Sequence, residues 1–245
     1  MSVSVIIPTL NMARYLPDAI ASIARQDRAV TEVIVIDSES TDGTADLVVG
    51  YKKAGVPIQL LQIAKVGPSA ARNKGIAAAK SDFIAFLDAD DLWPDGKVAR
   101  QLDYLDAFAA KGMVSGFVRC FDILDPVKLV PATDARIETL FHVHVGACIY
   151  RKAVFDRIGT FDESFLYSED VDLLLRLREA DIDFTILRSV MLYYRKHGAS
   201  MMAQKNPRKT ADFRLAVAKS VARRRANGGP PVDMDLFETF LEPAR

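Results

Sequence analysis

The segment "SDFIAFLDADDLWPDG", from Ser81 to Gly96, places three carboxylates directly after an apolar run of strand length. Only Ala89 separates Asp88 from Asp90, and Asp91 follows at once. Carboxylates this close repel one another unless a cation or a set of donors neutralises them, so folding alone gives no reason for the cluster. A hard cation such as Mg²⁺ takes one or two carboxylates and completes its shell with phosphate oxygens. The segment therefore predicts a buried strand that ends at a metal and diphosphate site.

Earlier segments have the same apolar character: "VSVIIP" (residues 3–8), "EVIVID" (32–37) and "PIQLLQI" (57–63). They are continuously apolar rather than alternating, as expected of strands that are buried on both faces of a parallel sheet. Helix-length segments follow the four strands, at about residues 15–26, 44–53, 69–80 and 95–110. This alternation predicts an α/β fold, with an open, mostly parallel twisted sheet and helices on both faces.

The second half has a different pattern. "MVSGFVRCFDI" (113–123), "LFHVHVGACIYR" (140–151) and "FTILRSVMLYYR" (184–195) are predicted strands, and a helix is predicted over about 168–180. No composition change marks a linker, so these elements are expected to extend the same sheet and to form a pocket wall beside it. A basic helical segment (205–225) follows, and "NGGPP" ends it.

The 245 residues are half hydrophobic and carry a formal net charge of zero, which gives no support for nucleic-acid binding. Cys120 and Cys148 are too few for a disulfide framework or a zinc site, and we expect small buried side chains in a reducing compartment. The N-terminus lacks the pattern of a signal peptide, and no apolar run reaches the roughly 18 residues of a transmembrane helix. We therefore expect a cytoplasmic protein whose membrane contact, if present, is peripheral.

Polar side chains follow the predicted strands where a ligand of an open α/β sheet would bind, at the carboxyl ends. They are Thr9 and Asn11, Asp37 and Asp42, Arg72 and Asn73, and the carboxylate cluster. Each of the first three groups has an alternative role, because Ser, Asp and Thr also cap helices and Arg or Asn can be ordinary surface residues. Together they predict one continuous rim of a crevice.

A separate pair of acids lies in "FLYSEDVDLLLRL" (165–177). Ser168 has the sequence position of a helix N-cap, and Glu169 and Asp170 fall in the first turn. Acids at this end of a helix are stabilised by its dipole, so both side chains could serve the helix alone. Alternatively, one of them faces the crevice as a general base. The sequence by itself leaves both roles open.

Five segments taken in order resemble family 2 glycosyltransferases, which have the GT-A fold: "VSVIIPTLN", "VIVIDSESTDGT", "GPSAARNKGIAAAKSDFIAFLDADDLW", "VGACIYRKAVFDRIGTFDESFLYSEDVDLLLRL" and "YYRKHGASMM". The resemblance runs from about Val3 to Met202. It implies one GT-A domain over residues 1–200, with a nucleotide-binding half to about 110 and an acceptor half from about 111. Residues 201–245 would form a C-terminal helical extension.

The resemblance implies an inverting, hexosyltransferase-type enzyme that moves a sugar from a nucleotide diphosphate to an acceptor hydroxyl, with Mg²⁺ or Mn²⁺ at the Asp-X-Asp (DXD) motif. The implied acceptor is a saccharide or a lipid-linked molecule in cell-surface polysaccharide or lipopolysaccharide assembly. Asp170 would be the general base, with Glu169 and Trp93 at the acceptor site. Asp90 and Asp88 would bind the metal, with Asp91 beside them. The residues implied to bind the donor nucleotide are Thr9, Asn11, Asp37, Arg72, Asp88 and His197.

One departure concerns the nucleotide. The family commonly has Asp-Asp-Gly where this chain has Asp37-Ser38-Glu39, which weakens the inference to uracil; UDP is still our first expectation, with GDP and dTDP open. A nucleotidyltransferase of related fold and a non-catalytic sugar-nucleotide binding protein are the alternatives. His142 and His144 are predicted to share one strand face as structural or acceptor-wall residues, and Trp93 could instead anchor the helix after the cluster.

The basic segment near the C-terminus allows two interpretations. From Met191 to Gly228 there are ten Lys or Arg residues and one acid, Asp212. Phe213, Val217 and Val221 recur at intervals of four, which is typical of a helix face. The helix could pack on the domain, or it could attach the protein peripherally to an anionic membrane.

Overall fold

The structure, a computed structural model, describes residues 1–28, 30–141, 143–198, 200, 205–228 and 240–242. In the first half the elements are β1 (Val3–Thr9), α1 (Leu16–Ala24), β2 (Glu32–Asp37), α2 (Thr44–Lys53), β3 (Ile58–Gln62), α3 (Pro68–Ala78), β4 (Phe83–Phe86) and α4 (Lys97–Ala107). The second half contributes β5 (Met113–Phe121), β6 (Leu124–Asp125), β7 (Val130–Pro131), β8 (Glu138–Leu140), η1 (Val145–Ala147), β9 (Ile149–Arg151), α5 (Ala153–Ile158), α6 (Glu169–Glu179), β10 (Phe184–Arg195) and α7 (Arg208–Asn227).

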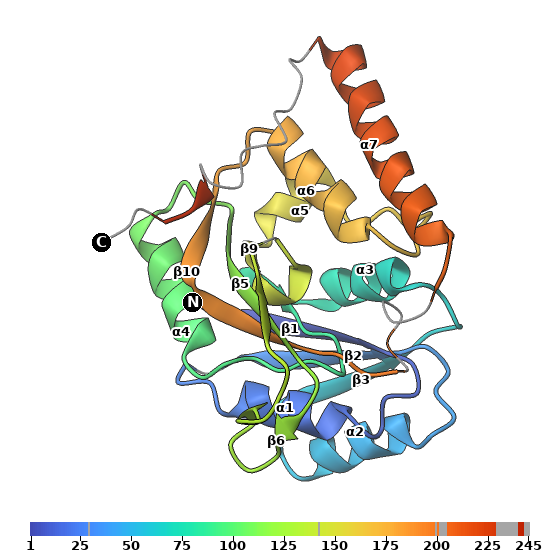
Figure 1. The fold of residues 1–245 in the computed structure, drawn as a ribbon, viewed down its shortest axis with the longest axis vertical. Coiled ribbons are helices and arrows are strands. Elements are labelled where there is room, and N and C mark those ends of the chain that lie inside the picture. The colour runs from blue at the N-terminus through green and yellow to red at the C-terminus, as the bar shows by residue number, and fades with distance from the viewer. Residues whose placement is uncertain (29, 142, 199, 201–204, 229–239, 243–245) are drawn as a thin grey trace.

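The main sheet has the strand order β10-β5-β9-β4-β1-β2-β3, and β8 pairs with β5 beside this path. Strands β1 to β4 run parallel to one another, and β5 runs parallel to β10. β9 is antiparallel to both β4 and β5 and joins the two halves (Figure 1). The predicted open, mostly parallel α/β sheet is therefore confirmed, because strands of the second half extend the sheet of the first.

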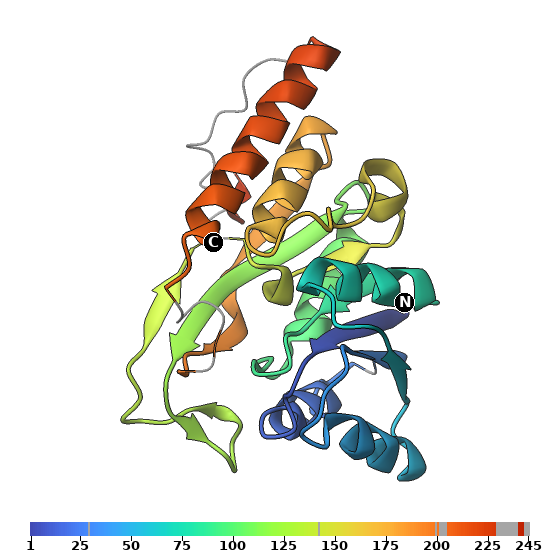
Figure 2. The same cartoon turned by 90° about the vertical axis from the view of Figure 1, so that its right-hand side faces the viewer.

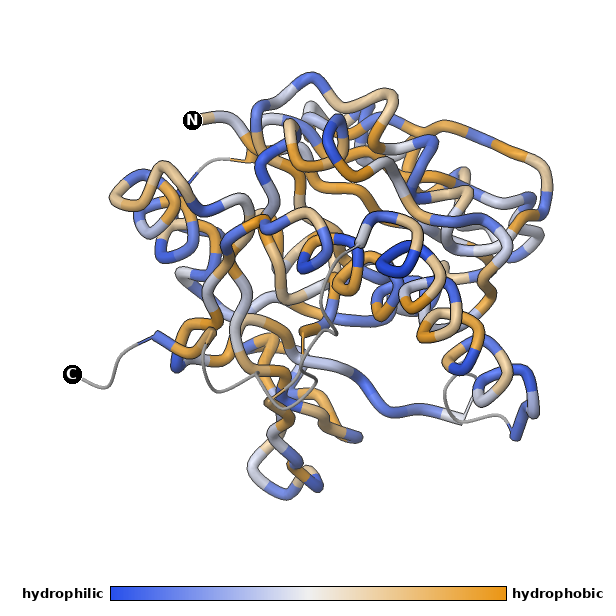
Figure 3. Tube along the Cα trace, turned by 90° about the horizontal axis from the view of Figure 1, so that it is seen from above, coloured by the Kyte–Doolittle hydropathy of each residue, from blue (hydrophilic) through white to orange (hydrophobic). Residues whose placement is uncertain are grey.

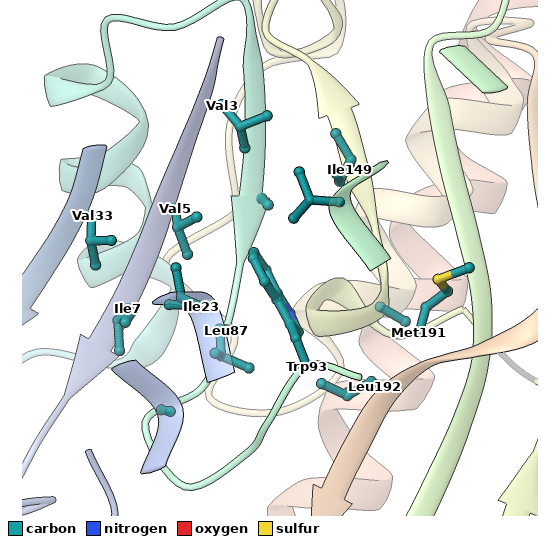
Figure 4. Close-up of a cluster of buried hydrophobic side chains, with 14 of the residues drawn as sticks. Val3, Val5, Ile7, Ile23, Val33, Leu87, Trp93, Ile149, Met191 and Leu192 are labelled. Atoms are coloured by element: carbon teal, nitrogen blue, oxygen red, sulfur yellow. The ribbon is translucent and has the colours of Figure 1, made fainter. Parts of the chain in front are cut away.

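Helices cover both faces of the sheet, as predicted. Successive residues of a strand point to opposite faces, and in β1 Val5 packs on the side of α1, α2 and α4 whereas Ile6 packs on the side of α3, α5 and α6. Figure 4 shows the first of these two cores, in which Trp93 lies among Val5, Leu87 and Leu192. Continuous apolar strands are therefore explained by two cores, one on each face.

The basic segment forms α7, which lies alongside α6 (Figure 2). Arg223 binds Glu179 and Asp172 of α6, and Lys219 binds Asp162 in the preceding loop. Much of the basic charge thus pairs within the chain, as the packing interpretation predicts, while Phe213 remains 45% exposed. Within the described residues no helix is long and apolar enough to cross a membrane, and Figure 3 shows hydrophilic residues interspersed along the helices.

The prediction of one strand over residues 140–151 is wrong. β8 ends at Leu140, β9 begins at Ile149, and between them the chain turns through η1. The imidazole of His144 accepts a hydrogen bond from the amide of Gly146, and the amide of Ala147 donates to the carbonyl of His144. These local bonds replace a strand ladder, so His144 does not lie on a strand face. His142 lies outside the described residues.

Candidate active site

The ends of β1 and β2 place the first predicted rim residues side by side, because Thr9 pairs in register with Asp37. The Thr9 hydroxyl donates to the buried Asp37 carboxylate over 3.3 Å, and the amide of Ser40 donates to its other oxygen. Asn11 adopts a left-handed backbone (φ 55°), and its side-chain oxygen accepts from the amide of Thr41 over 2.8 Å. Thr9, Asn11 and Asp37 therefore join the loops that follow β1 and β2 into one wall.

Asp42 supports these loops rather than facing a ligand. Its carboxylate accepts from the amide and hydroxyl of Thr44 and from the amide of Ala13. Burial alone would raise the pKa of Asp42, but these hydrogen bonds outweigh burial and lower it. Asp42 therefore has the alternative role given above, since it binds backbone amides at the start of α2 and in the loop after β1.

Arg72 joins two segments that lie far apart in the sequence. From the middle of α3, its guanidinium donates to Asp88 over 2.8 Å and to Glu169 over 2.6 Å, and the residue is only 3% exposed. Burial alone would lower the pKa of Arg72, but the two carboxylates outweigh it and raise the pKa. Burial alone would raise the pKa of Asp88, and Arg72 outweighs it and lowers the pKa. For Glu169 burial prevails over the same guanidinium and raises the pKa. Arg72 therefore holds the tip of β4 against the start of α6.

Asp90 and His197 form the second contact across the site. The Nε2 atom of His197 lies 2.8 Å from a carboxylate oxygen of Asp90, and its ring stacks on Tyr15 with centroids 4.5 Å apart. Burial and the charge of Asp88 raise the pKa of Asp90. Burial, together with Asp90 and Asp88, raises the pKa of Asp91 well above its usual range. The neighbouring cations therefore do not fully neutralise the negative charge of the three carboxylates.

In the described part of the chain, no group of three or more His, Cys, Asp or Glu side chains is arranged to hold a metal ion unaided. A site completed by substrate is different, because Mg²⁺ uses one or two carboxylates and takes its other ligands from phosphates and water. Burial is the largest cause of the raised pKa values of Asp90 and Asp91, and the charge of the neighbouring carboxylates, crowded at this strand tip, raises them further. A divalent cation would relieve that crowding, so the residues present fit a cation that the substrate helps to bind.

The start of α6 places Glu169 and Asp170 in one helical turn. Ser168 sits at the N-cap position, as predicted, with a left-handed backbone (φ 60°), and its side chain makes no capping hydrogen bond. Glu169 turns to Arg72. Asp170 accepts from the amide of Val171 over 2.8 Å and is only partly buried. Burial raises the pKa of Tyr150 most, Cys148 raises it further, and the charge of Asp170 adds to both. Asp170 therefore lies at the head of α6, near β9 and next to the Arg72 contact.

Trp93 lies in the core instead of lining an acceptor site. Its side chain is 1% exposed, and its indole N–H donates to the carbonyl of Gly146 over 3.1 Å. The ammonium of Lys97 lies 4.2 Å from the ring centroid. A buried indole offers no face to a sugar, so the acceptor-site prediction for Trp93 is corrected to its alternative, an anchor for α4.

His144, predicted from the sequence to be a structural or acceptor-wall residue, has the charges of the site around it. Burial lowers its pKa, and the charges of Asp88, Arg72 and Glu169 all act on it, so the imidazole lies beside the Arg72 contact. The ring also packs edge-on against Tyr194, 5.7 Å away. No spacing signal could have indicated this, because these partners lie 25 to 72 residues away in the chain and are brought together only by the sheet.

The fold and these contacts define an α/β protein of GT-A type, with its polar site at the carboxyl ends of the strands. The family model for glycosyl transferase family 2 matches residues 4–159, and the chain belongs to this family. The family predicted from the sequence is thus confirmed.

The curated relatives are named as glycosyltransferases. Over 210 residues the chain is 26% identical to the amylovoran biosynthesis glycosyltransferase AmsB of Erwinia amylovora, covering 79% of this chain and 69% of AmsB. Over 195 residues it is 28% identical to the uncharacterized glycosyltransferase EpsJ of Bacillus subtilis, covering 73% of this chain and 57% of EpsJ. The chain spans 38% to 64% of the lengths of EpsJ and three other matching relatives, so it corresponds to a part of those proteins.

Solved structures agree in fold. S. aureus TarS 1–349 in complex with UDP-GlcNAc superposes with a TM-score of 0.72 at 22% identity, covering 89% of this chain and 66% of TarS 1–349. The mannosyltransferase PcManGT from Pyrobaculum calidifontis, in complex with GDP-Man and Mn²⁺, superposes with a TM-score of 0.67 at 20% identity, covering 96% and 68%. At these identities the likeness establishes the GT-A fold alone.

Proposed function

We propose that this chain transfers a sugar from a nucleoside diphosphate to an acceptor hydroxyl, with inversion at the anomeric carbon and with the help of Mg²⁺ or Mn²⁺. The observation that carries the proposal is the double contact at the tip of β4, where Asp88 binds Arg72 and Asp90 binds His197. It places two carboxylates, a guanidinium and an imidazole at the carboxyl edge of the sheet, where a sugar nucleotide would need them.

The donor would lie along the ends of β1, β2 and β4. Thr9, Asn11 and Asp37 form the wall beside which the base and ribose would rest, and Arg72 would fix the adjoining carboxylate of Asp88. Asp90 and Asp88 would hold the cation, which when bound supplies positive charge to the diphosphate leaving group. His197 would border the diphosphate. UDP is the first nucleotide to test, with GDP and dTDP next.

Asp170 would remove the proton of the acceptor hydroxyl as its oxygen attacks the anomeric carbon. The new bond forms on the face opposite the breaking bond to the diphosphate, which inverts the carbon, and the diphosphate leaves with the bonding electrons. Asp170 suits this role because it is partly exposed in the first turn of α6, beside the Glu169 that Arg72 joins to the tip of β4. Glu169 would border the acceptor without taking the proton.

The acceptor would be a saccharide or a lipid-linked molecule in the assembly of a cell-surface polysaccharide, as the name of AmsB suggests for that relative. We also propose that residues 1–200 form the transferase unit and that α7 belongs to a C-terminal extension, with a cytoplasmic location. Peripheral attachment through α7 predicts flotation with anionic vesicles. No flotation would end that part of the proposal.

A thermal-shift screen tests the donor site. UDP-, GDP- and dTDP-sugars are each added with Mn²⁺ or with a chelator to the wild type, to Asp90→Ala and to Asp103→Ala, whose carboxylate is exposed on α4 and 70% accessible. A ligand at about 100 times its Kd stabilises the fold by about 2.7 kcal/mol. We expect a metal-dependent shift with one nucleotide class that Asp90→Ala abolishes and Asp103→Ala retains. A shift indifferent to metal and to Asp90, or no shift with any donor, would contradict the proposal.

A further inference from the structure

Asp91, the third carboxylate of the cluster, points away from the proposed cation site. Its side chain is 1% exposed, and one oxygen accepts a hydrogen bond from the backbone amide of Arg195 over 2.9 Å. The next residue, Leu92, exchanges two backbone hydrogen bonds with Tyr193, of 3.1 and 2.9 Å. Three hydrogen bonds therefore join the loop after β4 to the last residues of β10.

This junction lies next to His197 in the sequence and positions the backbone that leads to it. His197 follows Arg195 by two residues, and its imidazole lies 2.8 Å from Asp90, the residue before Asp91. Adjacent acids of one loop thus hold the same strand end at two points, Asp91 through a backbone amide and Asp90 through a side chain. Only Lys196 lies between these two points, and its amide donates to the carbonyl of Phe121 over 2.7 Å, so Asp91 and β5 together fix the backbone that leads to His197.

The side chain of Arg195 is fixed separately. It donates to Asp18 of α1 over 2.8 Å and lies over the rings of Tyr15 and Phe121, at 5.2 and 5.8 Å from their centroids. Tyr15 also stacks on His197. These contacts orient side chains, whereas the bond from Asp91 holds the backbone from which both side chains extend.

Packing alone does not account for a carboxylate in this position. The second oxygen of Asp91 is buried and has no hydrogen-bond partner among the described residues, and the same is true of Nε of Arg195 and Nδ1 of His197. A buried polar atom without a partner loses the hydration it had in the unfolded chain. Such atoms collect where a structure serves binding as well as stability, and three of them meet at this junction.

We infer that Asp91 is a positioning residue, which holds the end of β10 so that His197 stays on Asp90 at the donor site. The expected effect on nucleotide binding rests on the proposed function, since a displaced His197 weakens binding only if the site binds a nucleoside diphosphate. Its structural part, that Asp91 orders residues 193–197, does not depend on that function.

The test combines hydrogen exchange with nucleotide binding. Asp91→Leu fills a similar volume and cannot accept the bond, whereas Asp91→Asn retains the accepting oxygen. Asp172 supplies the matched control, because it is also 1% exposed but binds Arg176 and Arg223 in the α6–α7 contact. Backbone exchange is followed by mass spectrometry, and the Kd of UDP, GDP and dTDP is measured by calorimetry with Mn²⁺.

We expect Asp91→Leu to accelerate exchange in residues 193–197 and to weaken binding of the nucleotide about tenfold, as the loss of one hydrogen bond to a charged group would. Asp91→Asn should rescue both, to within about threefold of the wild-type Kd. Asp172→Leu should lower the Tm and leave the exchange of residues 193–197 and the Kd of the nucleotide unchanged. If Asp91 acts through His197, adding Asp91→Leu to His197→Ala should weaken binding no further than His197→Ala alone.

Two results would overturn the inference: wild-type exchange in residues 193–197 of Asp91→Leu, or a loss of binding that the two substitutions produce additively. If the leucine variant does not fold, Asp91→Ala replaces it in the same measurements. A wild type that binds none of the three nucleotides would contradict the proposed function instead, and the exchange of residues 193–197 would still decide the structural part.

Discussion

Among the residues that the structure describes, Arg72 and Lys97 are buried cations, and their surroundings differ. Arg72 is 3% exposed and binds two carboxylates, whereas Lys97 is fully buried and has the amide oxygen of Gln101 at 2.6 Å and the ring of Trp93 as its neighbours. The pKa of Arg72 is raised, while burial lowers the pKa of Lys97 to about 7. A counter-charge therefore decides whether a buried cation stays charged, and burial of a cation by itself does not mark a functional site.

The largest effect is expected at the proposed general base, whose loss should reduce turnover without disturbing the ion pairs of Arg72. Asp170→Asn should reduce turnover about 10²–10⁴-fold, because a general base contributes on that scale, while the Arg72 contacts and the Kd of the donor stay near their wild-type values. Steady-state kinetics and calorimetry measure the two quantities on the same samples. Unchanged turnover would remove Asp170 from the proposed mechanism.

The next effect breaks the paired cation. Arg72→Met should destabilise the protein by about 3–5 kcal/mol, since Asp88 and Glu169 would be left buried without their counter-charge. Urea unfolding at pH 7 measures the loss. Arg72→Lys is the control, because it retains the charge but cannot bond to both carboxylates at once, so it should fall between the wild type and Arg72→Met.

Removal of the charge of Lys97, which has no carboxylate beside it in the contacts described above, should change stability in the opposite direction. Between pH 7 and 10.5 the unfolded chain binds a proton at Lys97 that the folded chain does not, so wild-type stability should rise with pH across this window. Below pH 7 the folded state carries the full cost of the buried charge. Lys97→Met should therefore stabilise the protein at pH 6 by about 1–3 kcal/mol and flatten the rise above pH 7.

Urea midpoints of the wild type and Lys97→Met at pH 6, 7, 8 and 9 check this expectation. A methionine variant that is less stable than the wild type at pH 6 would mean that the bond to Gln101 and the contact with Trp93 offset the buried charge. The contrast between the two cations would then be one of degree.

A surface pair gives the smallest effect and calibrates the other two. Burial alone would raise the pKa of Asp162, but hydrogen bonds from Lys219 and Ser164 outweigh it and lower the pKa to about 2. The stabilisation is present above about pH 4 and is lost as pH falls towards 2. Both partners are about one third exposed, so solvent screening reduces it, and Asp162→Asn should cost about 0.5 kcal/mol at pH 7. A loss above about 2 kcal/mol would show that this contact between α7 and the domain is not screened.

Much of the architecture could be predicted because its signals are local. The apolar runs at residues 3–8, 32–37 and 57–63 became β1, β2 and β3, and the predicted helices appeared with slightly shorter bounds. The failures share one cause, which is competition from contacts outside the segment. Residues 140–151 have the pattern of one strand, but the imidazole of His144 accepts a hydrogen bond from the amide of Gly146 and the chain turns there. Trp93 was predicted at the acceptor site, but its side chain is buried in the core.

The sequence by itself determined the first four strands, the family and the acids at the tip of β4, because hydrophobic periodicity and short motifs are properties of neighbouring residues. Only the tertiary structure decided which acid does what. Asp88 is turned to Arg72, Asp90 to His197 and Asp91 to the backbone of Arg195, although the three stand within four positions of one another. Their partners come from α3 and the end of β10, and only the folded sheet brings those segments to one edge.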